Sequence, residues 1–300
     1  MGAFCATKGR DNLIKVIASD LDGTLLNENH TLSERTIEAI HKAQEKGIRF
    51  MIATGRSFQQ AMTAFENVNV VCDYIVSSGG EVRNPKKEIL FSKYMKMEDY
   101  KSVYEILSQY ELMFLFNSNE WDYGIGNPEE MEEKMLEQFY IFHQTIPKEV
   151  IREIPLFKQM LDKTIAVPDF ETLCSMNPQI VKVIAFSENI EMLKEIKQKL
   201  QSNSNLAVVS SFPNNLEITD VTAQKGPVVK KYIESLGYSM DEVMVFGDSL
   251  NDYSMLSMDF GATVAMENAD SELKKAAKYI TKSNVDDGVA YAIEKLLEGE

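Results

Sequence analysis

The sequence predicts an α/β protein in which a doubly wound parallel sheet forms the main domain and a second, smaller α/β domain is inserted into it. Three observations lead to this fold class. Strands and helices alternate over residues 13–80, and the same alternation returns after residue 225. The long stretch between them instead suggests more local units that are rich in surface residues. Such alternation is typical of a parallel sheet whose faces are covered by helices.

The first predicted strand ends in two aspartates. The apolar residues 13–18 predict a buried strand, Asp20 and Asp22 come after it, and Gly23 then helps to turn the chain. Carboxylates at the carboxyl end of a parallel strand project into the crevice where open α/β sheets bind ligands. Two carboxylates there repel each other unless a cation or a shared proton intervenes, so the pair indicates a metal-assisted site. On this motif alone, an Asx turn with both aspartates solvated is an equally open interpretation.

The elements that follow continue the alternation. Ser33 predicts the start of a helix that runs to residue 46, and Gly47 predicts its end. Two strands come next, each ended by small or polar residues: 48–53 before Thr54-Gly55-Arg56, and 74–76 before Ser77-Ser78-Gly79-Gly80. The later part predicts helices over 228–236, 271–278 and 289–297, and strands over 243–246, 262–266 and 279–281.

The middle of the chain predicts the inserted domain. Asn127 and Pro128 are typical of a helix start. Further on we expect a strand over 180–186, a helix over 190–200, and strands over 206–210 and 216–219. The predicted organisation is an N-terminal extension over 1–12, a main domain over 13–83 and 219–300, and an inserted domain over 84–218, with hinges near Arg83-Asn84-Pro85 and Thr219-Asp220.

Four polar clusters of the main domain lie at predicted strand ends or loops: Asp20/Asp22, Thr54-Gly55, Lys225, and Asp248/Asn251/Asp252. Because parallel strands end at one edge of a sheet, we expect these side chains to meet there. The set suits phosphoryl transfer. A carboxylate can attack phosphorus, Mg²⁺ prefers hard oxygen ligands, and lysine and hydroxyl groups stabilise the charge on the phosphoryl oxygens. Taken singly, each residue also has a structural explanation, such as Asp248 capping a helix near Leu250.

These clusters resemble the four motifs of the haloacid dehalogenase superfamily of aspartate-nucleophile phosphatases. The matching residues are Asp20-Leu21-Asp22-Gly23-Thr24, Thr54-Gly55-Arg56, Lys225-Gly226, and Gly247-Asp248 through Asn251-Asp252. The chain is most similar to the Cof-type subfamily, which carries a large α/β cap between its second and third motifs. Residues 265–269 and 284–290 also resemble Cof-type segments. The resemblance implies a Rossmann-like core and identifies residues 84–218 with the cap.

The resemblance also implies a role for each matching residue. Asp20 would be the nucleophile, and Asp22 the general acid and base, with its backbone carbonyl on the metal. The residues implied to hold the phosphate are Leu21, Thr54, Gly55, Lys225 and Asn251. Those implied to hold Mg²⁺ are Asp20, Asp22, Asp248, Ser249 and Asp252, and Asp252 could instead orient Lys225. Cof-type chains commonly carry Asn-Gly after the third strand where this chain has Ser78-Gly79, so substrate contacts of that loop do not carry over.

Composition narrows the classes of function. A net charge of −15 argues against nucleic acids or anionic membranes as partners. No apolar run approaches the roughly 18 residues that cross a bilayer, and no signal-peptide pattern opens the chain. The cysteines (Cys5, Cys72 and Cys174) show no metal-ligand spacing and indicate a reducing compartment. We therefore expect a cytoplasmic protein with buried structural thiols.

The predicted function is a Mg²⁺-dependent phosphatase that hydrolyses a small phosphorylated metabolite, such as a sugar phosphate, through an aspartyl-phosphate. Phosphohexomutase-like transfer and a non-catalytic binding or regulatory protein on the same fold are the alternatives. Both a monomer and a homodimer are open. No role is predicted for His30, His41 or His143. Trp121 is interpreted as a core residue, with substrate contact as the alternative.

Overall fold

The computed structural model describes residues 14–66, 68–142 and 146–299. The chain divides into two compact units, the first made of residues up to Ser92 and from Thr222 onward, the second of Lys93–Val221. The prediction of an α/β fold built on a parallel sheet is confirmed. The predicted extension 1–12, Cys5 and His143 lie outside the described residues.

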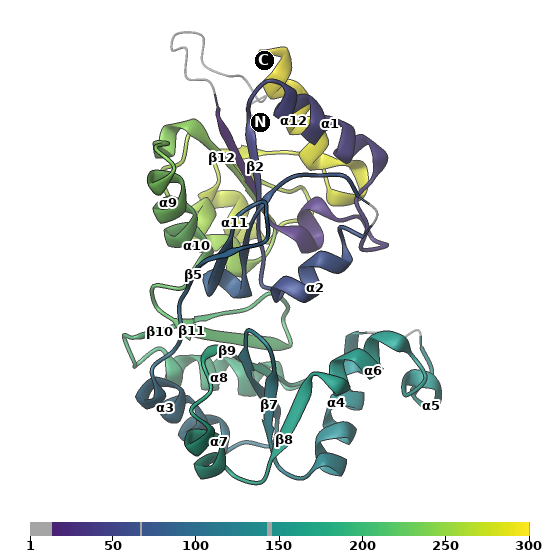
Figure 1. Ribbon diagram of the computed structural model, residues 1–300, viewed down its shortest axis with the longest axis vertical. Helices are drawn as coiled ribbons and strands as arrows, with labels where there is room; N and C mark the ends of the chain where they lie inside the picture. Colours follow the sequence, from purple (N-terminus) through teal and green to yellow (C-terminus); the bar gives the residue numbers. More distant parts are fainter. Residues whose placement is uncertain (1–13, 67, 143–145, 300) are drawn as a thin grey trace. The chain divides into compact units, whose positions relative to one another are not determined.

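The first unit contains an eight-stranded sheet of order β14-β13-β12-β1-β2-β3-β4-β5 (Figure 1). Its strands are Val16–Ser19 (β1), Arg49–Ala53 (β2), Asp73–Val76 (β3), Glu81–Arg83 (β4), Ile89–Ser92 (β5), Val243–Gly247 (β12), Ala262–Ala265 (β13) and Tyr279–Ile280 (β14). Neighbours from β14 to β3 pair in parallel, and β4 and β5 add an antiparallel edge. Strands β1 and β12 are buried along their whole length, as expected for a parallel sheet with both faces covered.

Helices cover the two faces of this sheet. The helices α1 (Glu34–Glu45) and α12 (Gly288–Glu298) pack together on one face, and α9 (Lys225–Ser235) and α10 (Tyr253–Leu256) on the other (Figure 1). Helix α1 begins after Ser33, whose side chain accepts a hydrogen bond from the Thr36 amide, and it is followed by Gly47 at a φ of 82°. The unit also contains α2 (Phe58–Thr63), α11 (Ser271–Ala276) and the short turns η1 (Leu21–Leu25), η2 (Ser77–Gly79), η3 (Met240–Glu242), η4 (Leu250–Asp252) and η5 (Asn284–Asp286).

The second unit is built on a six-stranded sheet of order β10-β11-β9-β6-β7-β8. Its strands are Met113–Ser118 (β6), Asp122–Ile125 (β7), Thr164–Val167 (β8), Ile180–Phe186 (β9), Leu206–Val209 (β10) and Asn215–Asp220 (β11). Its helices are Met97–Leu107 (α3), Pro128–Phe142 (α4), Lys148–Ile151 (α5), Pro155–Asp162 (α6), Phe170–Met176 (α7) and Ile190–Leu200 (α8). The sheet separates two apolar clusters. Phe116 packs in the one that includes α3, α7 and α8, and its neighbour Leu115 packs in the one around α4, α5 and α6, because successive strand residues point to opposite faces.

The boundary between the units differs from the predicted one. Residues 89–92 form β5, which pairs with β4 in the sheet of the first unit, so the second unit begins at Lys93 rather than at residue 84. Arg83 ends β4 and Asn84 lies in the β4–β5 hairpin, so the hinge expected there is wrong. Thr219 and Asp220 belong to β11, and the second boundary follows Val221. Strands this short carry little local signal, and their place follows from pairing with neighbours.

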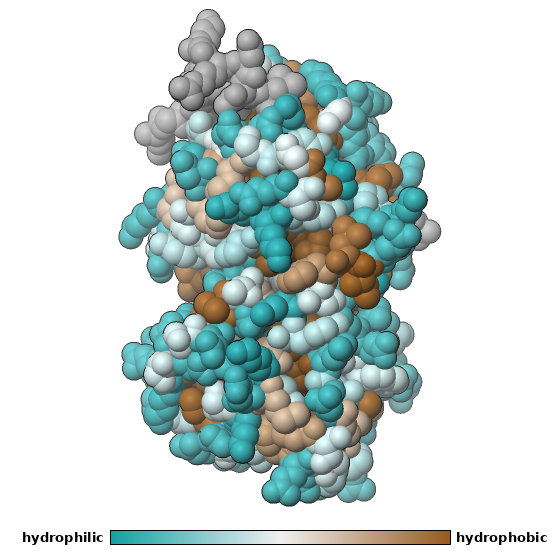
Figure 2. Space-filling model, turned by 60° about the vertical axis from the view of Figure 1, so that its left-hand side comes forward, coloured by the Kyte–Doolittle hydropathy of each residue, from teal (hydrophilic) through white to brown (hydrophobic). Residues whose placement is uncertain are grey.

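The exposure of individual residues bears on the expectations for Trp121 and for the cysteines. Trp121 lies in the turn between β6 and β7 with 40% of its surface exposed, so its interpretation as a core residue is wrong. Cys72 is buried and Cys174 is partly buried. Hydrophilic residues cover most of the face shown in Figure 2. Among the described residues, no helix is both long and apolar enough to cross a bilayer.

Candidate active site

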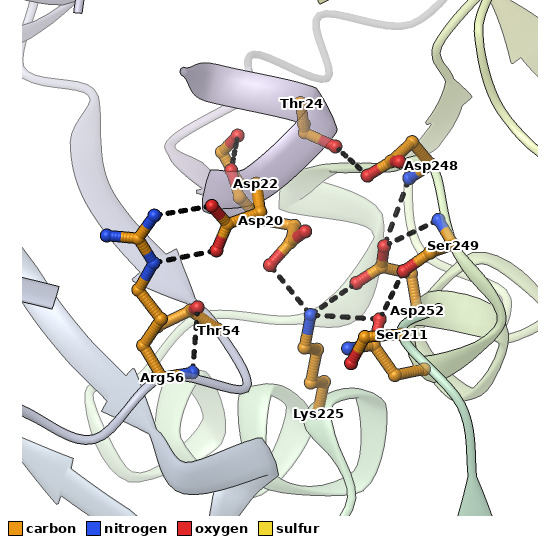
Figure 3. A network of polar contacts seen from close by, with 12 residues as sticks. Asp20, Asp22, Thr24, Thr54, Arg56, Ser211, Lys225, Asp248, Ser249 and Asp252 are labelled. Carbon is orange, nitrogen blue, oxygen red and sulfur yellow. Dashed lines mark hydrogen bonds and ion pairs between the residues drawn. The ribbon is translucent and has the colours of Figure 1, made fainter. Parts of the chain in front are cut away.

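The centre of the candidate site is the carboxyl end of β1. Asp20 directly follows this strand and is 3% exposed, and its amide donates a hydrogen bond of 3.1 Å to the Phe246 carbonyl of β12. Lys225, the first residue of α9, donates from Nζ to Asp20 Oδ1 at 2.7 Å (Figure 3). The lysine is 1% exposed, so two residues far apart in the sequence form a buried ion pair.

The loop after β12 supplies the other partners of this lysine. Lys225 Nζ donates to Asp252 Oδ1 at 2.7 Å and to Asn251 Oδ1 at 3.3 Å. Asp252 also holds its own loop, because its Oδ2 accepts hydrogen bonds from the amides of Asp248 and Ser249 at 3.0 and 3.2 Å. Ser249 and Asp252 form the capping box at η4, so Asp248 is not the residue that caps this turn. One ammonium group therefore joins the loops after β1 and β12.

Three carboxylates gather around this junction. Oxygen atoms of Asp20, Asp248 and Asp252 all lie within 4.8 Å of one another. Burial, with repulsion from Asp252, raises the pKa of Asp20 well above its usual range, and the same two causes raise the pKa of Asp248 to about 7. Burial alone would lower the pKa of Lys225, but the carboxylates of Asp20 and Asp252 outweigh it and raise that pKa. The cluster therefore carries an excess of buried negative charge that a proton or a cation must balance.

The donor set of this cluster suits Mg²⁺. Carboxylate oxygens are the hard ligands that this ion prefers, and it is usually bound by one or two of them together with water and substrate oxygens. Thr24 Oγ1 donates to Asp248 Oδ1 at 2.8 Å and so orients this carboxylate within the cluster. The residues present therefore fit a divalent cation.

Asp22 is only two residues from Asp20, yet its side chain has different partners. Arg56 donates from Nε to Asp22 Oδ2 at 2.7 Å and from Nη2 to Oδ1 at 2.5 Å, and His30 Nδ1 lies 3.5 Å from Oδ1. Burial alone would raise the pKa of Asp22, but hydrogen bonds from His30 and Arg56 outweigh it and lower the pKa to about 2. Figure 3 shows the Asp20 carboxylate directed at Lys225 and the Asp22 carboxylate at Arg56.

The loop after β2 is held by the loop after β3. Thr54 Oγ1 accepts a hydrogen bond of 3.1 Å from the Arg56 amide. The Ser78 amide donates to the Thr54 carbonyl at 3.0 Å, and the Ser77 amide to the Arg56 carbonyl at 2.8 Å. Ser77 and Ser78 have φ values of 52° and 60°, a left-handed conformation that costs a non-glycine residue on the order of 1 kcal/mol. Tertiary contacts therefore hold this strained turn beneath Thr54-Gly55-Arg56.

The structure brings six of the predicted site residues into one hydrogen-bonded group: Asp20, Lys225, Asp248, Ser249, Asn251 and Asp252. Leu21 is fully buried at the start of η1, and Gly55 lies in the loop between Thr54 and Arg56. The contacts of Arg56 and His30 with Asp22 were not predicted from the sequence. Arg56 carried a signal, because it is a charged residue three positions after the buried end of β2. His41, by contrast, forms an exposed hydrogen bond with the Asn69 carbonyl.

Comparisons with known proteins agree with this arrangement. A family model described as haloacid dehalogenase-like hydrolase matches residues 17–293. The chain is similar to the 5-amino-6-(5-phospho-D-ribitylamino)uracil phosphatase YwtE of Bacillus subtilis, at 30% identity over 96% of this chain and 99% of that protein. A second phosphatase of that name from the same organism, YcsE, is 27% identical over 93% of this chain and 94% of its own. A solved haloacid dehalogenase-like hydrolase from B. subtilis has a TM-score of 0.79 at 26% identity, covering 93% of this chain and 99% of that one.

Proposed function

Because this chain belongs to the haloacid dehalogenase-like hydrolases, we propose that it is a magnesium-dependent phosphatase that forms an aspartyl-phosphate on Asp20. Hydrolysis of phosphoric monoesters is the activity named for its relatives. The observation that carries the proposal is the buried contact of 2.7 Å between Asp20 and Lys225 inside a cluster of three carboxylates. In this arrangement the nucleophile, Asp20, lies beside a positive charge that can stabilise the phosphoryl oxygens.

The reaction has two displacements. In the first, a carboxylate oxygen of Asp20 attacks phosphorus, the bond to the leaving oxygen breaks, and that oxygen takes a proton from Asp22. In the second, water attacks phosphorus, gives a proton to Asp22, and releases inorganic phosphate and a free Asp20. Lys225 stabilises the charge on the phosphoryl oxygens. The phosphoryl group is held by Thr54, Asn251 and the backbone of Leu21 and Gly55.

Asp20, Asp248 and Asp252 are the residues that would hold Mg²⁺, with the Asp22 carbonyl and Ser249 beside them. When bound, the ion offsets the excess negative charge of this cluster and of the substrate phosphate. Lys225 contributes to the same balance from within the fold, since it contacts both Asp20 and Asp252.

The protonation state of Asp22 follows from the charges of its partners. Paired with Arg56 and His30 its carboxylate is ionised, which is the form that accepts a proton from water in the second displacement. To act as the acid in the first displacement, Asp22 must carry a proton, and this weakens both hydrogen bonds from Arg56. We infer that the carboxylate leaves Arg56 when it protonates the leaving oxygen.

The proposed substrate is a phosphorylated metabolite with a polyhydroxylated chain, such as a sugar phosphate. Two similar phosphatases are named for a substrate that carries a phosphorylated ribityl chain, which supports this class. We propose that the second unit, Lys93–Val221, serves as the cap that selects the leaving group. Within it Trp121, which is 40% exposed, is the candidate for substrate contact. Its replacement by alanine should raise KM for the best substrate while p-nitrophenyl phosphate turnover stays within about twofold.

The test is a phosphate-release assay over sugar phosphates, ribityl phosphates, nucleotides and an aryl phosphate, with Mg²⁺ and with EDTA. Asp20→Asn should abolish turnover and Asp259→Asn, an exposed aspartate of the same unit, should not. Mass spectrometry of the protein quenched during turnover should locate one phosphoryl group on Asp20. Wild-type turnover by Asp20→Asn would contradict the assignment, and isomerised sugar phosphate from an added bisphosphate would indicate a mutase.

A further inference from the structure

We propose that Asn268 and Asn284 are positioning residues that hold the turn carrying Asp22, an inference that rests on the proposed role of Asp22 as acid and base. These residues lie in the two late segments that resemble Cof-type chains, one after β13 and one at the start of η5. The proposed chemistry assigns neither of them a part. Both contact the turn η1, which directly follows Asp20.

The two asparagines contact the turn at its middle and at its end. Asn268 Nδ2 donates to the Gly23 carbonyl at 2.8 Å, one residue after Asp22. Asn284 Nδ2 donates to the Leu26 carbonyl at 2.9 Å, at the end of η1. The asparagines are also linked to each other, because the Asn284 amide donates to Asn268 Oδ1 at 3.0 Å. Two side-chain amides, from the segments after β13 and β14, thus contact the turn that follows β1.

This turn needs partners from outside because it is not a regular helix. Asp22 has a ψ of 127° and Gly23 a φ of 71°, so neither continues a helical ladder. The Leu26 amide closes the turn on the Leu21 carbonyl at 2.9 Å. An irregular turn depends on side chains around it for a single conformation. The Gly23 carbonyl is bonded to Asn268, and it lies next to the peptide of Asp22.

Because Asn268 is exposed, its effect on the orientation of Asp22 can be measured apart from any effect on the stability of the fold. Its side chain is exposed, so water can replace it at the Gly23 carbonyl, and its loss should cost little free energy of unfolding. The direction of the Asp22 side chain is more sensitive, because a shift of about 1 Å in a catalytic group can cost on the order of 100-fold in rate. Asn268 and Asn284 should therefore act through Asp22.

The test compares two leaving groups. An alkoxide needs a proton from Asp22, whereas p-nitrophenolate leaves without one. Asn268→Ala and Asn284→Ala should lower kcat/KM for an alkyl phosphate by about tenfold or more and change kcat/KM for p-nitrophenyl phosphate by less than about twofold. The ratio kcat/KM reports the first displacement, so it leaves out the second displacement, which both substrates share. Asn268→Asp keeps the shape and removes the donor, so it should behave like Asn268→Ala.

The matched control is Asn84→Ala in the β4–β5 hairpin. Asn84 also donates through its amide, to Glu88 Oε2 at 2.6 Å, and accepts a backbone amide, from Glu88 at 3.0 Å, but it contacts no part of η1 in these bonds. This variant should keep wild-type kcat/KM for both substrates. An equal fall in kcat/KM for both substrates in the Asn268 and Asn284 variants, or no fall, would overturn the proposal.

A double-mutant cycle distinguishes this inference from the function on which it rests. In an Asp22→Asn background, Asn268→Ala should cause no further loss of alkyl phosphatase activity, since the group that it positions is already absent. A further loss of the same size would mean that Asn268 acts elsewhere. If Asp22→Asn itself lowers kcat/KM for the two phosphates equally, the assigned role of Asp22 as the acid fails first. Melting temperatures of all variants identify any that have merely unfolded.

Discussion

Arg56 and Asp22 form a two-point ion pair between the loops that follow β2 and β1, with hydrogen bonds of 2.7 and 2.5 Å. The planar guanidinium matches both carboxylate oxygens, a geometry that lysine cannot reproduce. The pair explains how two aspartates in one turn have different partners. Asp20 shares the buried ammonium of Lys225, while Asp22 is held ionised by Arg56.

Removal of this guanidinium should shift the pH dependence of the reaction. Arg56 helps to lower the pKa of Asp22 to about 2, so Arg56→Ala should raise that pKa toward its ordinary value. The acid limb of the kcat profile for p-nitrophenyl phosphate should then move to higher pH, because the second displacement, in which ionised Asp22 accepts a proton, limits turnover of a substrate with such a good leaving group. Arg56→Lys should give an intermediate shift. Arg35→Ala, which breaks a pair with Glu294 instead, should leave the limb in place. An unmoved limb in Arg56→Ala would show that Asp22 does not set it.

Mg²⁺ should stabilise the folded protein in the absence of substrate. An ion that binds only the native state at 100 times its Kd adds about 2.7 kcal/mol to the free energy of unfolding. We expect the melting temperature to rise with Mg²⁺ and to return on addition of EDTA. Asp248→Asn should abolish most of this rise, whereas Asp259→Asn, whose side chain pairs with Lys278 on the surface, should retain it. An equal rise in both variants would place the ion elsewhere.

Loss of the buried ammonium should destabilise the fold. Lys225→Met leaves Asp20 and Asp252 without their cation, and removal of one partner of a buried pair costs about 3–5 kcal/mol. Urea unfolding without Mg²⁺ should show this loss. Lys230→Met, which removes an exposed partner of Glu234 on the same helix, should cost less than about 1 kcal/mol. Similar values for the two lysines would mean that the buried pair contributes little.

Asp122 should make the second unit less stable as the pH rises. Burial raises the pKa of Asp122, against the opposing effects of Asn117, Lys182 and Lys163. A raised folded-state pKa means that the folded protein binds more protons than the unfolded chain, so stability falls as the pH increases from the unfolded pKa to the folded one. Asp122→Asn should therefore raise the melting temperature at pH 7.

The gain from Asp122→Asn should shrink as the pH falls below the ordinary aspartate range, because Asp122 is then protonated in both states. The amide can still accept the hydrogen bond that Asn117 donates at 2.5 Å, so the local contact is preserved. Asp162→Asn, at an exposed end of α6, should show no such trend. A gain that does not depend on pH would contradict an electrostatic origin.

Much of the fold could be predicted because its signals are local. Ser33 and Gly47 mark the two ends of α1, and β9 and α8 have the expected bounds. The β4–β5 hairpin was not predicted, and the unit boundary was misplaced with it. Three or four residues of strand carry little periodicity, and their place depends on a neighbour that the local pattern does not name.

The contacts of the candidate site were likewise predicted only in part. Asp20, Lys225 and Asp252 were expected to meet, because parallel strands end at one edge of a sheet, and the structure joins them through one ammonium group. No spacing rule links Arg56 to Asp22, or Asn268 to Gly23. Those contacts depend on the directions of side chains in loops, which only the packed structure decides.

By itself, the sequence determined which residue types follow each strand, and hence the chemistry that one sheet edge can carry. The tertiary structure decided how that chemistry is divided between Asp20 and Asp22. The physical reason is that the two kinds of effect act over different distances along the chain. Periodicity and capping act within a few residues of the chain, whereas the charge state of a carboxylate depends on burial and on charges a few ångströms away. Lys225 and Arg56 supply those charges from other segments.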